Sequence, residues 1–471
     1  MRKINFIIII FVFFILSVIN ISAAEKLLLN DTDMIVTMGN SITQMGEDPG
    51  RYVFLMRKVL DTLYPERTIY IVNVGIGGHK STDMHARFKR DVLQYKPTWV
   101  TISVGVNDVW HGFDKDHPNG NGPNGVPLPE YKRLVTDMVK QAQNAGIKVA
   151  IFTATVIMEN LDSNENHNLQ PYNEALRTIA KDQKCMLVDM DKAFRHVLEP
   201  LQKPGMADRG VLTYDGVHMT PAGDWLIAKT ALMAFGVPAE RIELIQPAID
   251  KMTTEAWTDH AKHIARYAEV NHEVGDPRPD EKRVVMFGSS SVDGWNLAKA
   301  FPAIPFLNRG IGGENTRQMV LRMWDDMFPL KPYAAIIFFG SCNDFWPSNR
   351  MPVAETKSNI IKMARLLDEH NIKIAFGAIS PVNDYLPGKE SYIESHPVKV
   401  VQELNAWIQT FCKERGYVYA DFYTPMADKD GKLNAEYSND GMHCNDAGYE
   451  KWKPIVIQAL QKLDALPEGK D

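Results

Sequence analysis

Residues 33–43 read Asp33-Met34-Ile35-Val36-Thr37-Met38-Gly39-Asn40-Ser41-Ile42-Thr43, a short apolar run that ends in a glycine and then a serine. This layout is typical of a buried strand that brings a hydroxyl group to the edge of a sheet. The chain repeats the pattern at residues 283–291, which read Arg283-Val284-Val285-Met286-Phe287-Gly288-Ser289-Ser290-Ser291. Ser41 and Ser290 are therefore two candidate nucleophiles, about half a chain apart.

Short apolar runs alternate with amphipathic stretches around both serines. We expect strands at residues 34–38, 69–74, 99–104, 148–153 and 186–189, and again at 283–287, 305–308, 334–339, 373–378 and 417–421. We expect helices at residues 52–63, 82–93, 130–145, 171–181 and 221–235, and then at 316–327, 354–370, 397–414 and 446–463. This alternation predicts an α/β fold in which each half has a parallel, doubly wound sheet between two helical layers. In such folds ligands bind beyond the carboxyl ends of the strands.

The length of 471 residues suggests two or three domains at roughly 150 residues per domain. Since the strand pattern is repeated once, we predict a first domain at residues 25–245 and a second at 281–471. Residues 246–280 between them carry a helical pattern without a strand signal, and this pattern ends in the turn-forming run Gly275-Asp276-Pro277-Arg278-Pro279-Asp280. We interpret them as a helical linker.

The first 24 residues have the pattern of a secretory signal peptide. Arg2 and Lys3 precede an apolar stretch at residues 4–21, and the small residues Ser22-Ala23-Ala24 follow it. An uncleaved membrane anchor is the alternative, because the apolar stretch is about long enough to span a bilayer. We predict export to a periplasm or beyond, with no membrane association after cleavage.

Composition restricts the partners of the chain. Apolar residues make up 45% and charged residues 23%, as in a folded protein rather than a disordered one. The formal charge of -6, without a basic block, gives no reason to expect nucleic acid or anionic lipid as a partner. Four cysteines form no disulfide framework, so we expect free thiols at Cys185, Cys342, Cys412 and Cys444. A disulfide between Cys342 and Cys444 is the alternative.

A glycine-rich turn follows the second expected strand of each half. The two turns read Asn73-Val74-Gly75-Ile76-Gly77-Gly78 and Asn308-Arg309-Gly310-Ile311-Gly312-Gly313. Their glycine spacing differs from that of dinucleotide-binding turns, which argues against a nucleotide cofactor. Glycine allows a backbone N–H group to approach a ligand closely, which favours a donor to an oxyanion.

An asparagine follows the third expected strand of each half. The segments are Gly105-Val106-Asn107-Asp108 and, with one extra residue, Gly340-Ser341-Cys342-Asn343-Asp344. Such an asparagine can cap the next turn, or it can direct its amide group at a developing negative charge. Because of the extra residue, Asn343 stands three residues after its glycine, whereas Asn107 stands two residues after its own.

An aspartate stands three residues before a histidine near the end of each half. The segments are Tyr214-Asp215-Gly216-Val217-His218 and Asn439-Asp440-Gly441-Met442-His443. A serine nucleophile needs a base, and the base needs an acceptor that fixes its tautomer, so this pair supplies both groups. Serine, glycine, asparagine and Asp-x-x-His thus recur in one order, with different spacers.

This order resembles that of the SGNH or GDSL hydrolases over most of residues 29–240 and again of residues 281–466. The resemblance implies two flavodoxin-like α/β/α domains and serine esterase activity without a metal or an organic cofactor. It implies catalytic triads formed by Ser41, Asp215 and His218, and by Ser290, Asp440 and His443. It also implies oxyanion holes formed by Gly78 with Asn107, and by Gly313 with Asn343. Asn40 and Ser289 replace the aspartate that the family often has before its nucleophile.

Aromatic residues near these motifs indicate a substrate. Trp110, Trp295 and Trp346 either stack on sugar rings at the mouth of a site or pack in the core. Residues 111–128, rich in Asn, Gly and Pro, predict a loop beside the first site. With export, these features favour removal of O-acetyl groups from polysaccharides or oligosaccharides. A lysophospholipase or thioesterase is the alternative, and so is one catalytic domain beside a non-catalytic carbohydrate-binding one.

Overall fold

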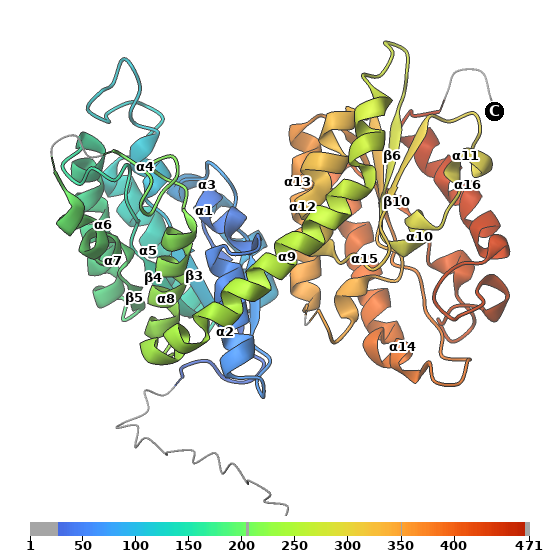
Figure 1. Ribbon diagram of the computed structural model, residues 1–471, viewed down its shortest axis with the longest axis horizontal. Helices are drawn as coiled ribbons and strands as arrows, with labels where there is room; N and C mark the ends of the chain where they lie inside the picture. The colour runs from blue at the N-terminus through green and yellow to red at the C-terminus, as the bar shows by residue number, and fades with distance from the viewer. Residues whose placement is uncertain (1–26, 204–206, 350, 467–471) are drawn as a thin grey trace, which may run out of the picture.

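The computed structural model describes residues 27–203, 207–349 and 351–466, which form two α/β units joined by one long helix (Figure 1). We call the residues before this helix, 27–238, the N-terminal unit, and those after it, 275–466, the C-terminal unit. The predicted signal peptide, residues 1–24, lies outside the described residues.

The N-terminal unit is built on a five-stranded, entirely parallel sheet with the order β2-β1-β3-β4-β5. Its strands are β1 (Met34–Met38), β2 (Tyr70–Asn73), β3 (Trp99–Ser103), β4 (Lys148–Phe152) and β5 (Met186–Val188). Val36 of the central strand pairs with Val72 on one side and Val100 on the other, and all three side chains are buried. The strand order is that of flavodoxin-like folds, as predicted.

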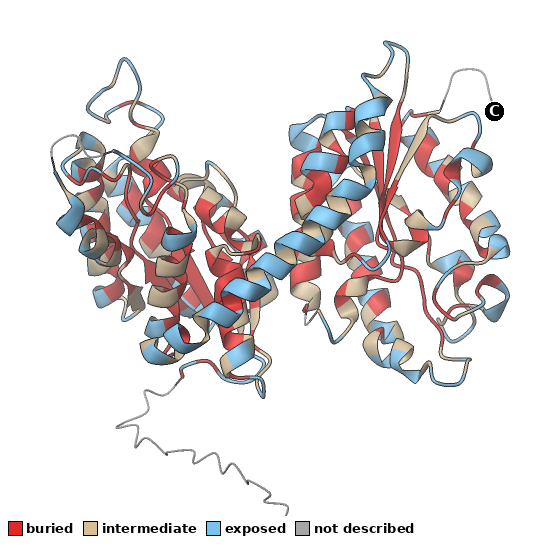
Figure 2. Ribbon diagram, viewed as in Figure 1, coloured by how far each residue is buried: buried red, intermediate tan, exposed pale blue. Residues whose placement is uncertain are grey.

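Helices cover both faces of this sheet, so that the core has two halves. One half contains residues of α2, α7 and α8, and the other contains residues of α3, α5 and α6. The helices of the unit are α1 (Ser41–Gln44), α2 (Tyr52–Leu63), α3 (Ser81–Asp91), α4 (Val106–Trp110), α5 (Leu128–Asn144), α6 (Asn164–Asp182), α7 (Met190–Leu198) and α8 (Pro221–Ala234). Figure 2 shows the buried sheet between these outer layers.

The C-terminal unit repeats this architecture with the strand order β10-β9-β8-β6-β7. Its strands are β6 (Val284–Gly288), β7 (Phe306–Gly310), β8 (Ala334–Phe338), β9 (Lys373–Gly377) and β10 (Val418–Ala420). Read from the other edge, the order matches that of the first sheet. Its helices are α10 (Ser290–Asp293), α11 (Leu297–Ala300), α12 (Thr316–Asp326), α13 (Val353–Glu369), α14 (Glu390–Ser395), α15 (Val398–Arg415) and α16 (Asp446–Lys462).

The expected strands and helices are confirmed with small shifts at their ends, apart from α6. The structure also contains α7 and the short helices α1, α4, α10, α11 and α14, which were not expected. Helix α6 begins at Asn164, not at Pro171, because the Ser163 side chain accepts a hydrogen bond from the Asn166 N–H at 3.2 Å and caps the helix there. Pro171 therefore lies inside α6. Helix α7 was not expected, although Asp189 caps its first turn.

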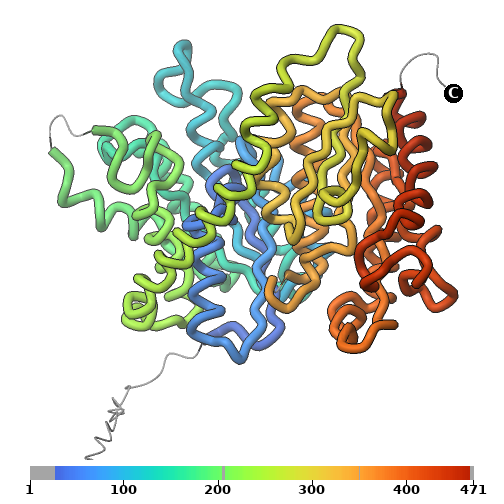
Figure 3. The backbone as a smooth tube through the Cα atoms, turned by 45° about the vertical axis from the view of Figure 1, so that its right-hand side comes forward, coloured from blue at the N-terminus to red at the C-terminus, as the bar shows by residue number. Residues whose placement is uncertain are grey.

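Helix α9 (Ala239–Val274) connects the units in a single run of 36 residues. It crosses from one unit to the other, as Figures 1 and 3 show, and most of its length is exposed (Figure 2). Ile242 and Ile249 are its buried side chains. The predicted linker is thus helical, but the helix already begins at Ala239, and the domain boundaries at 245 and 281 stay a prediction.

The two units also touch directly, where α13 packs beside β2. The Ser358 hydroxyl donates to the Asn73 carbonyl oxygen at 2.7 Å. The buried Glu355 carboxylate of α13 forms ion pairs with Arg57 of the N-terminal unit at 3.4 Å and with Arg317 of α12. A Lys362–Glu47 ion pair of 3.5 Å joins the units as well. These contacts are polar and buried, which fixes the relative position of the units.

Asp48 lies at this interface, and from its titration we predict that the stability of the folded chain depends on pH. Burial raises the pKa of Asp48 to about 7, against the attraction of the Arg51 guanidinium. Because this pKa lies above that of the unfolded chain, the contribution of Asp48 to stability is complete below about pH 4 and is lost as the pH rises through about 7. Asp48→Asn stays neutral, so it should raise Tm relative to the wild type at pH 8, by roughly 2–4 °C, and leave it unchanged at pH 4.

Thermal unfolding at both pH values measures this difference. The control Asp162→Asn, at an exposed loop position, should show no such pH dependence. An equal Tm difference at pH 4 and pH 8 for Asp48→Asn would mean that the Asp48 carboxyl group does not titrate in this range.

Among the described residues, no helix combines the length and the apolar character needed to cross a bilayer. The four cysteines are all free thiols, so the alternative of a Cys342–Cys444 disulfide is wrong.

Candidate active site

Both candidate serines occupy the first position of a short helix directly after a central strand. In the N-terminal unit the Asn40 side chain accepts a hydrogen bond from the Ile42 N–H at 3.1 Å and caps α1, which begins at Ser41. In the C-terminal unit Ser290 likewise begins α10 after β6, but the Ser289 side chain does not cap this helix and donates instead to the Phe339 carbonyl oxygen at 2.9 Å. A side chain at Gly39 would lie 2.0 Å from the Thr43 hydroxyl oxygen, so the turn requires glycine.

The structure brings Ser41, His218 and Asp215 together in one line of hydrogen bonds. The Ser41 Oγ lies 2.9 Å from His218 Nε2, and His218 Nδ1 lies 2.6 Å from Asp215 Oδ2. The other carboxylate oxygen accepts the N–H groups of Val217 at 3.0 Å and His218 at 2.7 Å. Burial raises the pKa of Asp215, but these hydrogen bonds outweigh it and leave the pKa below its ordinary value. Asp215 is therefore an anion that orients the imidazole.

The C-terminal unit contains the same arrangement of Ser290, His443 and Asp440. The Ser290 Oγ lies 3.1 Å from His443 Nε2, and His443 Nδ1 lies 2.7 Å from Asp440 Oδ2. Burial is again outweighed by hydrogen bonds from His443, and the pKa of Asp440 falls to about 2. The His443 side chain is 47% exposed and that of His218 only 20%, so the second site is the more open one.

The two asparagines hold equivalent positions beside the serines. Asn107 Nδ2 donates to the His79 carbonyl oxygen at 3.1 Å, and Asn343 Nδ2 donates to that of Glu314 at 2.8 Å. His79 and Glu314 directly follow Gly78 and Gly313, which have φ values of 73° and 82°. An amide group has two N–H donors, so each asparagine keeps one for a ligand.

The extra residue before Asn343 does not displace this amide. In the N-terminal unit the chain turns at Gly105, which has a φ of 127°. In the C-terminal unit two residues share the turn, Gly340 with a φ of 59° and Cys342 with a φ of 71°. A positive φ is rare for a residue other than glycine. The geometry thus removes the reason to doubt the position of Asn343.

Two pairs of buried residues support both sites and were not predicted. Asp108 accepts hydrogen bonds from Ser81, from its N–H at 2.9 Å and from its hydroxyl at 2.5 Å. Asp344 binds Thr316 in the same manner, at 2.7 Å and 2.6 Å. These carboxyl groups connect the asparagine turn to the first residue of α3 in the N-terminal unit and of α12 in the C-terminal unit. Burial raises the pKa of Asp108 to about 6. The shared aspartate after each asparagine was the available signal.

Arg87 and Arg322 form the second pair. Arg87 donates to the carbonyl oxygens of Gly39 at 3.1 Å and Val74 at 2.6 Å. Arg322 donates to those of Gly288 at 3.2 Å and Arg309 at 2.8 Å. Each guanidinium thus connects the serine turn to the glycine-rich turn, since its fork of donors can bind two carbonyl groups at once.

Helix α9 supports the second site. Arg266 of α9 forms an ion pair with Asp293, whose other oxygen accepts the Gly312 N–H at 3.0 Å. The Tyr267 hydroxyl donates to the Gly310 carbonyl oxygen at 2.5 Å. In the N-terminal unit Gln44 alone accepts the equivalent Gly77 N–H. The glycine-rich turn of the second site therefore depends on the linker helix.

The aromatic residues near the sites have different environments. Trp295 is only 4% exposed and packs against Phe301, Tyr449 and Trp452, so the prediction that it contacts substrate is wrong. Although Trp295 stands only five residues after Ser290 in the sequence, the burial of its apolar ring in the core decides its position. Trp110 and Trp346 are half-buried, and the second packs edge-on against Tyr392 and His396.

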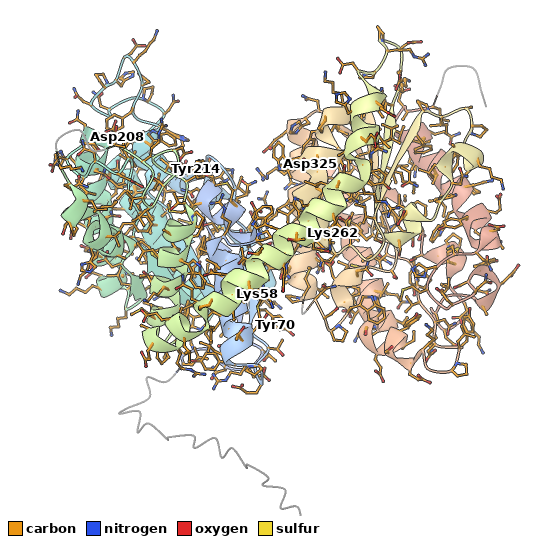
Figure 4. All side chains as sticks on the ribbon, in the orientation of Figure 1. Lys58, Tyr70, Asp208, Tyr214, Lys262 and Asp325 are labelled. Carbon is orange, nitrogen blue, oxygen red and sulfur yellow. The ribbon has the colours of Figure 1, made fainter. Side chains whose placement is uncertain are left out.

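Tyr214 is an exposed ring at the first site that the sequence did not suggest. Its side chain is 49% exposed and stacks on the His218 ring at a centroid distance of 5.8 Å. The Arg51 guanidinium lies 5.9 Å from the centroid of the tyrosine ring. Figure 4 labels Tyr214 on the N-terminal unit. The second site has Asn439 at the equivalent position.

The predicted loop of residues 111–128 lies beside the first site. The Val126 N–H donates to the Asp108 carbonyl oxygen at 2.9 Å, which holds the end of the loop against the asparagine turn. Lys80 Nζ donates to the Asn124 carbonyl oxygen at 2.7 Å. The loop therefore forms part of the surroundings of Asn107.

Known proteins resemble this chain over less than half of its length each. The chain is 30% identical over 227 residues to an acetylxylan esterase of Geobacillus stearothermophilus, an alignment that covers 46% of this chain and 96% of that enzyme. It is 26% identical over 213 residues to the isoamyl acetate-hydrolyzing esterase of Saccharomyces cerevisiae, covering 41% of this chain and 82% of the yeast enzyme. A crystal structure of the acetyl xylan esterase AlAXEase matches 43% of this chain and 98% of its own, with 30% identity and a TM-score of 0.38.

The model of the GDSL-like lipase/acylhydrolase family matches the chain twice, over residues 37–226 and 273–451. Each match contains one serine, one asparagine and one Asp-x-x-His pair of the two sites. The chain therefore belongs to the GDSL-like lipase/acylhydrolase family in both of its halves, and it is a hydrolase of carboxylic esters.

Proposed function

We propose that the chain is an exported esterase that removes O-acetyl groups from polysaccharides or oligosaccharides at two active sites. The observation that carries this proposal is the line of hydrogen bonds from Ser41 through His218 to Asp215, which recurs at Ser290. The similarity to an acetylxylan esterase over 96% of that enzyme supports the acyl group and the sugar. Export rests on the pattern of residues 1–24.

The proposed reaction passes through an acyl-enzyme. His218 Nε2 takes the proton of Ser41 as the Oγ attacks the acetyl carbonyl carbon. The bond to the sugar oxygen then breaks, and that oxygen takes the proton from His218. Water, deprotonated by His218, attacks the carbonyl carbon of the acetyl-serine. The bond from that carbon to the Ser41 Oγ breaks, the Oγ takes the proton back from His218, and the acetyl group leaves as acetic acid, which ionises to acetate. Asp215 keeps the imidazole in the tautomer that accepts at Nε2.

The Ser41 N–H, the Gly78 N–H and the free amide N–H of Asn107 are the proposed donors to the oxyanion. Gly78 suits this role because no atom lies within 4 Å of the position that a side chain would occupy there, so a ligand can approach its backbone. Gly313 has the same open space in the second site. Negative charge develops on the carbonyl oxygen in the transition state, so these donors accelerate the chemical step.

Asn107→Ala should lower kcat about 10²–10³-fold and change KM little, because the amide acts mainly in the transition state. The measurement uses a chain that also carries Ser290→Ala, so that only the first site reports. Asn343→Ala in the Ser41→Ala background is the matched variant, and it should show a similar loss. A loss below threefold in either background would exclude that asparagine from the oxyanion hole.

Substrate choice tests the proposed function. The mature chain should release acetate from acetylated xylan or xylo-oligosaccharides faster than fatty acid from a lysophospholipid or thiol from a long-chain acyl thioester. The reverse order would favour the lysophospholipase or thioesterase alternative. Mature protein recovered outside the cytoplasm with Glu25 at its N-terminus would agree with export.

A further inference from the structure

A cavity of about 270 Å³ lies where the two units and helix α9 meet, apart from both triads. The N-terminal unit contributes Gln44 and Asp48, which follow Ser41 closely in the chain. Helix α9 contributes Trp257 and His260, and helix α12 contributes Trp324 among others. Figures 1 and 3 show α9 crossing this junction, and Figure 4 labels Asp325 of α12 beside it. No single unit could form this cavity.

The tryptophans of the chain are distributed unevenly with respect to this cavity. The chain has nine tryptophans, all of them within the described residues, and only Trp257 and Trp324 are exposed, at 43% and 57%. Both line the cavity. Trp257 meets the His260 ring edge-on, and Trp324 meets Phe328 and His370 edge-on, so neither indole is stacked face to face with another ring. Large aromatic side chains that are exposed at the same cavity indicate a surface that binds a ligand.

The charges of the cavity favour a neutral ligand. Lys362 is paired with Glu47 at 3.5 Å, and Arg317 is paired with Glu355, so neither cation is left for an anion. Asp48 and Asp325 offer carboxyl oxygens, and Gln44 and Asn359 offer amide donors and acceptors. Burial lowers the pKa of His260, so its neutral ring can both donate and accept. Such a set suits hydroxyl groups.

The size and position of the cavity suit part of a sugar chain. Pockets for drug-sized ligands hold about 300–1,000 Å³, so this one fits a smaller group, such as one sugar unit. Its wall shares Gln44 with the first site. Gln44 accepts the Gly77 N–H, and a side chain at Gly77 would lie 3.0 Å from the Gln44 Oε1 and 3.8 Å from the Ser41 Cβ.

We propose that this cavity is a sugar-binding site in which Trp257 and Trp324 stack on a neutral pyranose ring of the oligosaccharide substrate. The inference rests on the proposed function and extends it, because it gives the tandem arrangement a purpose. Helix α9 and the C-terminal unit together provide a second binding site for the oligosaccharide substrate of the N-terminal active site.

Binding of unacetylated xylohexaose to the full chain tests this site without any ester cleavage. The measurement is titration calorimetry in the Ser41→Ala, Ser290→Ala background. Adding Trp257→Ala and Trp324→Ala should weaken binding roughly tenfold or more, by analogy with the loss on removal of an aromatic ring that stacks on a nucleic-acid base. Trp257→Phe should retain part of the affinity. Leu244→Ala, an 80% exposed position on the same helix outside the cavity, is the control and should bind as the parent does.

Kinetics of the active chain supply a second readout. In a Ser290→Ala background, so that Ser41 alone reacts, replacement of both tryptophans should raise KM for acetylated xylo-oligosaccharides about tenfold at unchanged kcat. Hydrolysis of 4-nitrophenyl acetate, which cannot reach the cavity and the serine together, should stay unchanged. An equal loss on both substrates at an unchanged Tm would overturn the assignment.

The outcomes separate this inference from the proposed function. Unaltered xylohexaose binding by the tryptophan variant, with acetate still released from the oligosaccharide, would overturn the sugar site and leave the esterase intact. Loss of binding in the variant would support the sugar site, even if the wild type released no acetate from carbohydrate. Absence of binding by the parent chain would overturn it.

Discussion

A chain that carries both Ser41→Ala and Ser290→Ala should lose about 10⁴-fold or more in kcat on any acetyl ester. The reason is geometric, since each hydroxyl lies within hydrogen-bond reach of a histidine held by a carboxylate, at 2.9 Å and 3.1 Å from Nε2. Without the hydroxyl no acyl-enzyme forms. Acetate release from an acetylated oligosaccharide, followed at saturating substrate, is the measurement.

The single serine variants identify the contribution of each site. Each should keep the activity of the remaining triad, and the two residual rates should add up to that of the wild type. Ser289→Ala is the matched control, because Ser289 precedes Ser290 but donates to the Phe339 carbonyl oxygen at 2.9 Å instead of facing a histidine. If Ser290→Ala changed no rate on any ester, the second unit would be a non-catalytic domain that kept the geometry.

Replacing the triad aspartates should be almost as damaging. Asp215→Asn with Asp440→Asn should lower kcat about 10⁴-fold, because an amide can donate to Nδ1 and so stabilise the wrong tautomer of the histidine. The structure supports this expectation, since each carboxylate accepts a backbone N–H and the imidazole together, at 2.7 Å and 2.6 Å in the first site. Steady-state kcat and KM on 4-nitrophenyl acetate provide the measurement.

Asp208→Asn is the control for this pair, because Asp208 is an exposed carboxylate of the segment that leads to Asp215 (Figure 4). It should leave kcat within about twofold of the wild type, as expected for a surface substitution. A loss of less than tenfold in the double aspartate variant would mean that the histidines do not depend on these carboxylates.

The fold and both triads could be predicted from the sequence because their signals are local. Most strands are largely apolar runs of five residues or fewer, and the serine, glycine and asparagine motifs each follow the end of a strand, where a parallel sheet collects such residues at one edge. Asp215 and His218 lie within a single turn, so their pairing needed no knowledge of the fold. Repetition of the order at Ser290 made coincidence a poor explanation.

The supporting residues could not be predicted because their partners are distant in sequence. Arg87 meets Gly39, and Asp108 meets Ser81, through contacts that only the folded sheet creates. For Trp295 the sequence suggested a role that the structure does not support. Its position five residues after Ser290 suggested contact with substrate, but the side chain is buried in the core. The interface between the units, including Glu355 with Arg57, joins residues that nothing in the local pattern connects.

The central claim is that the chain has two reactive serines. It is tested most directly by the intact mass of the mature chain after saturation with a fluorophosphonate, which forms a covalent bond to an activated serine. The account predicts two additions to the wild type, one to Ser41→Ala, one to Ser290→Ala and none to the double variant. Fewer than two additions to the wild type, or any addition that survives in the double variant, would contradict it.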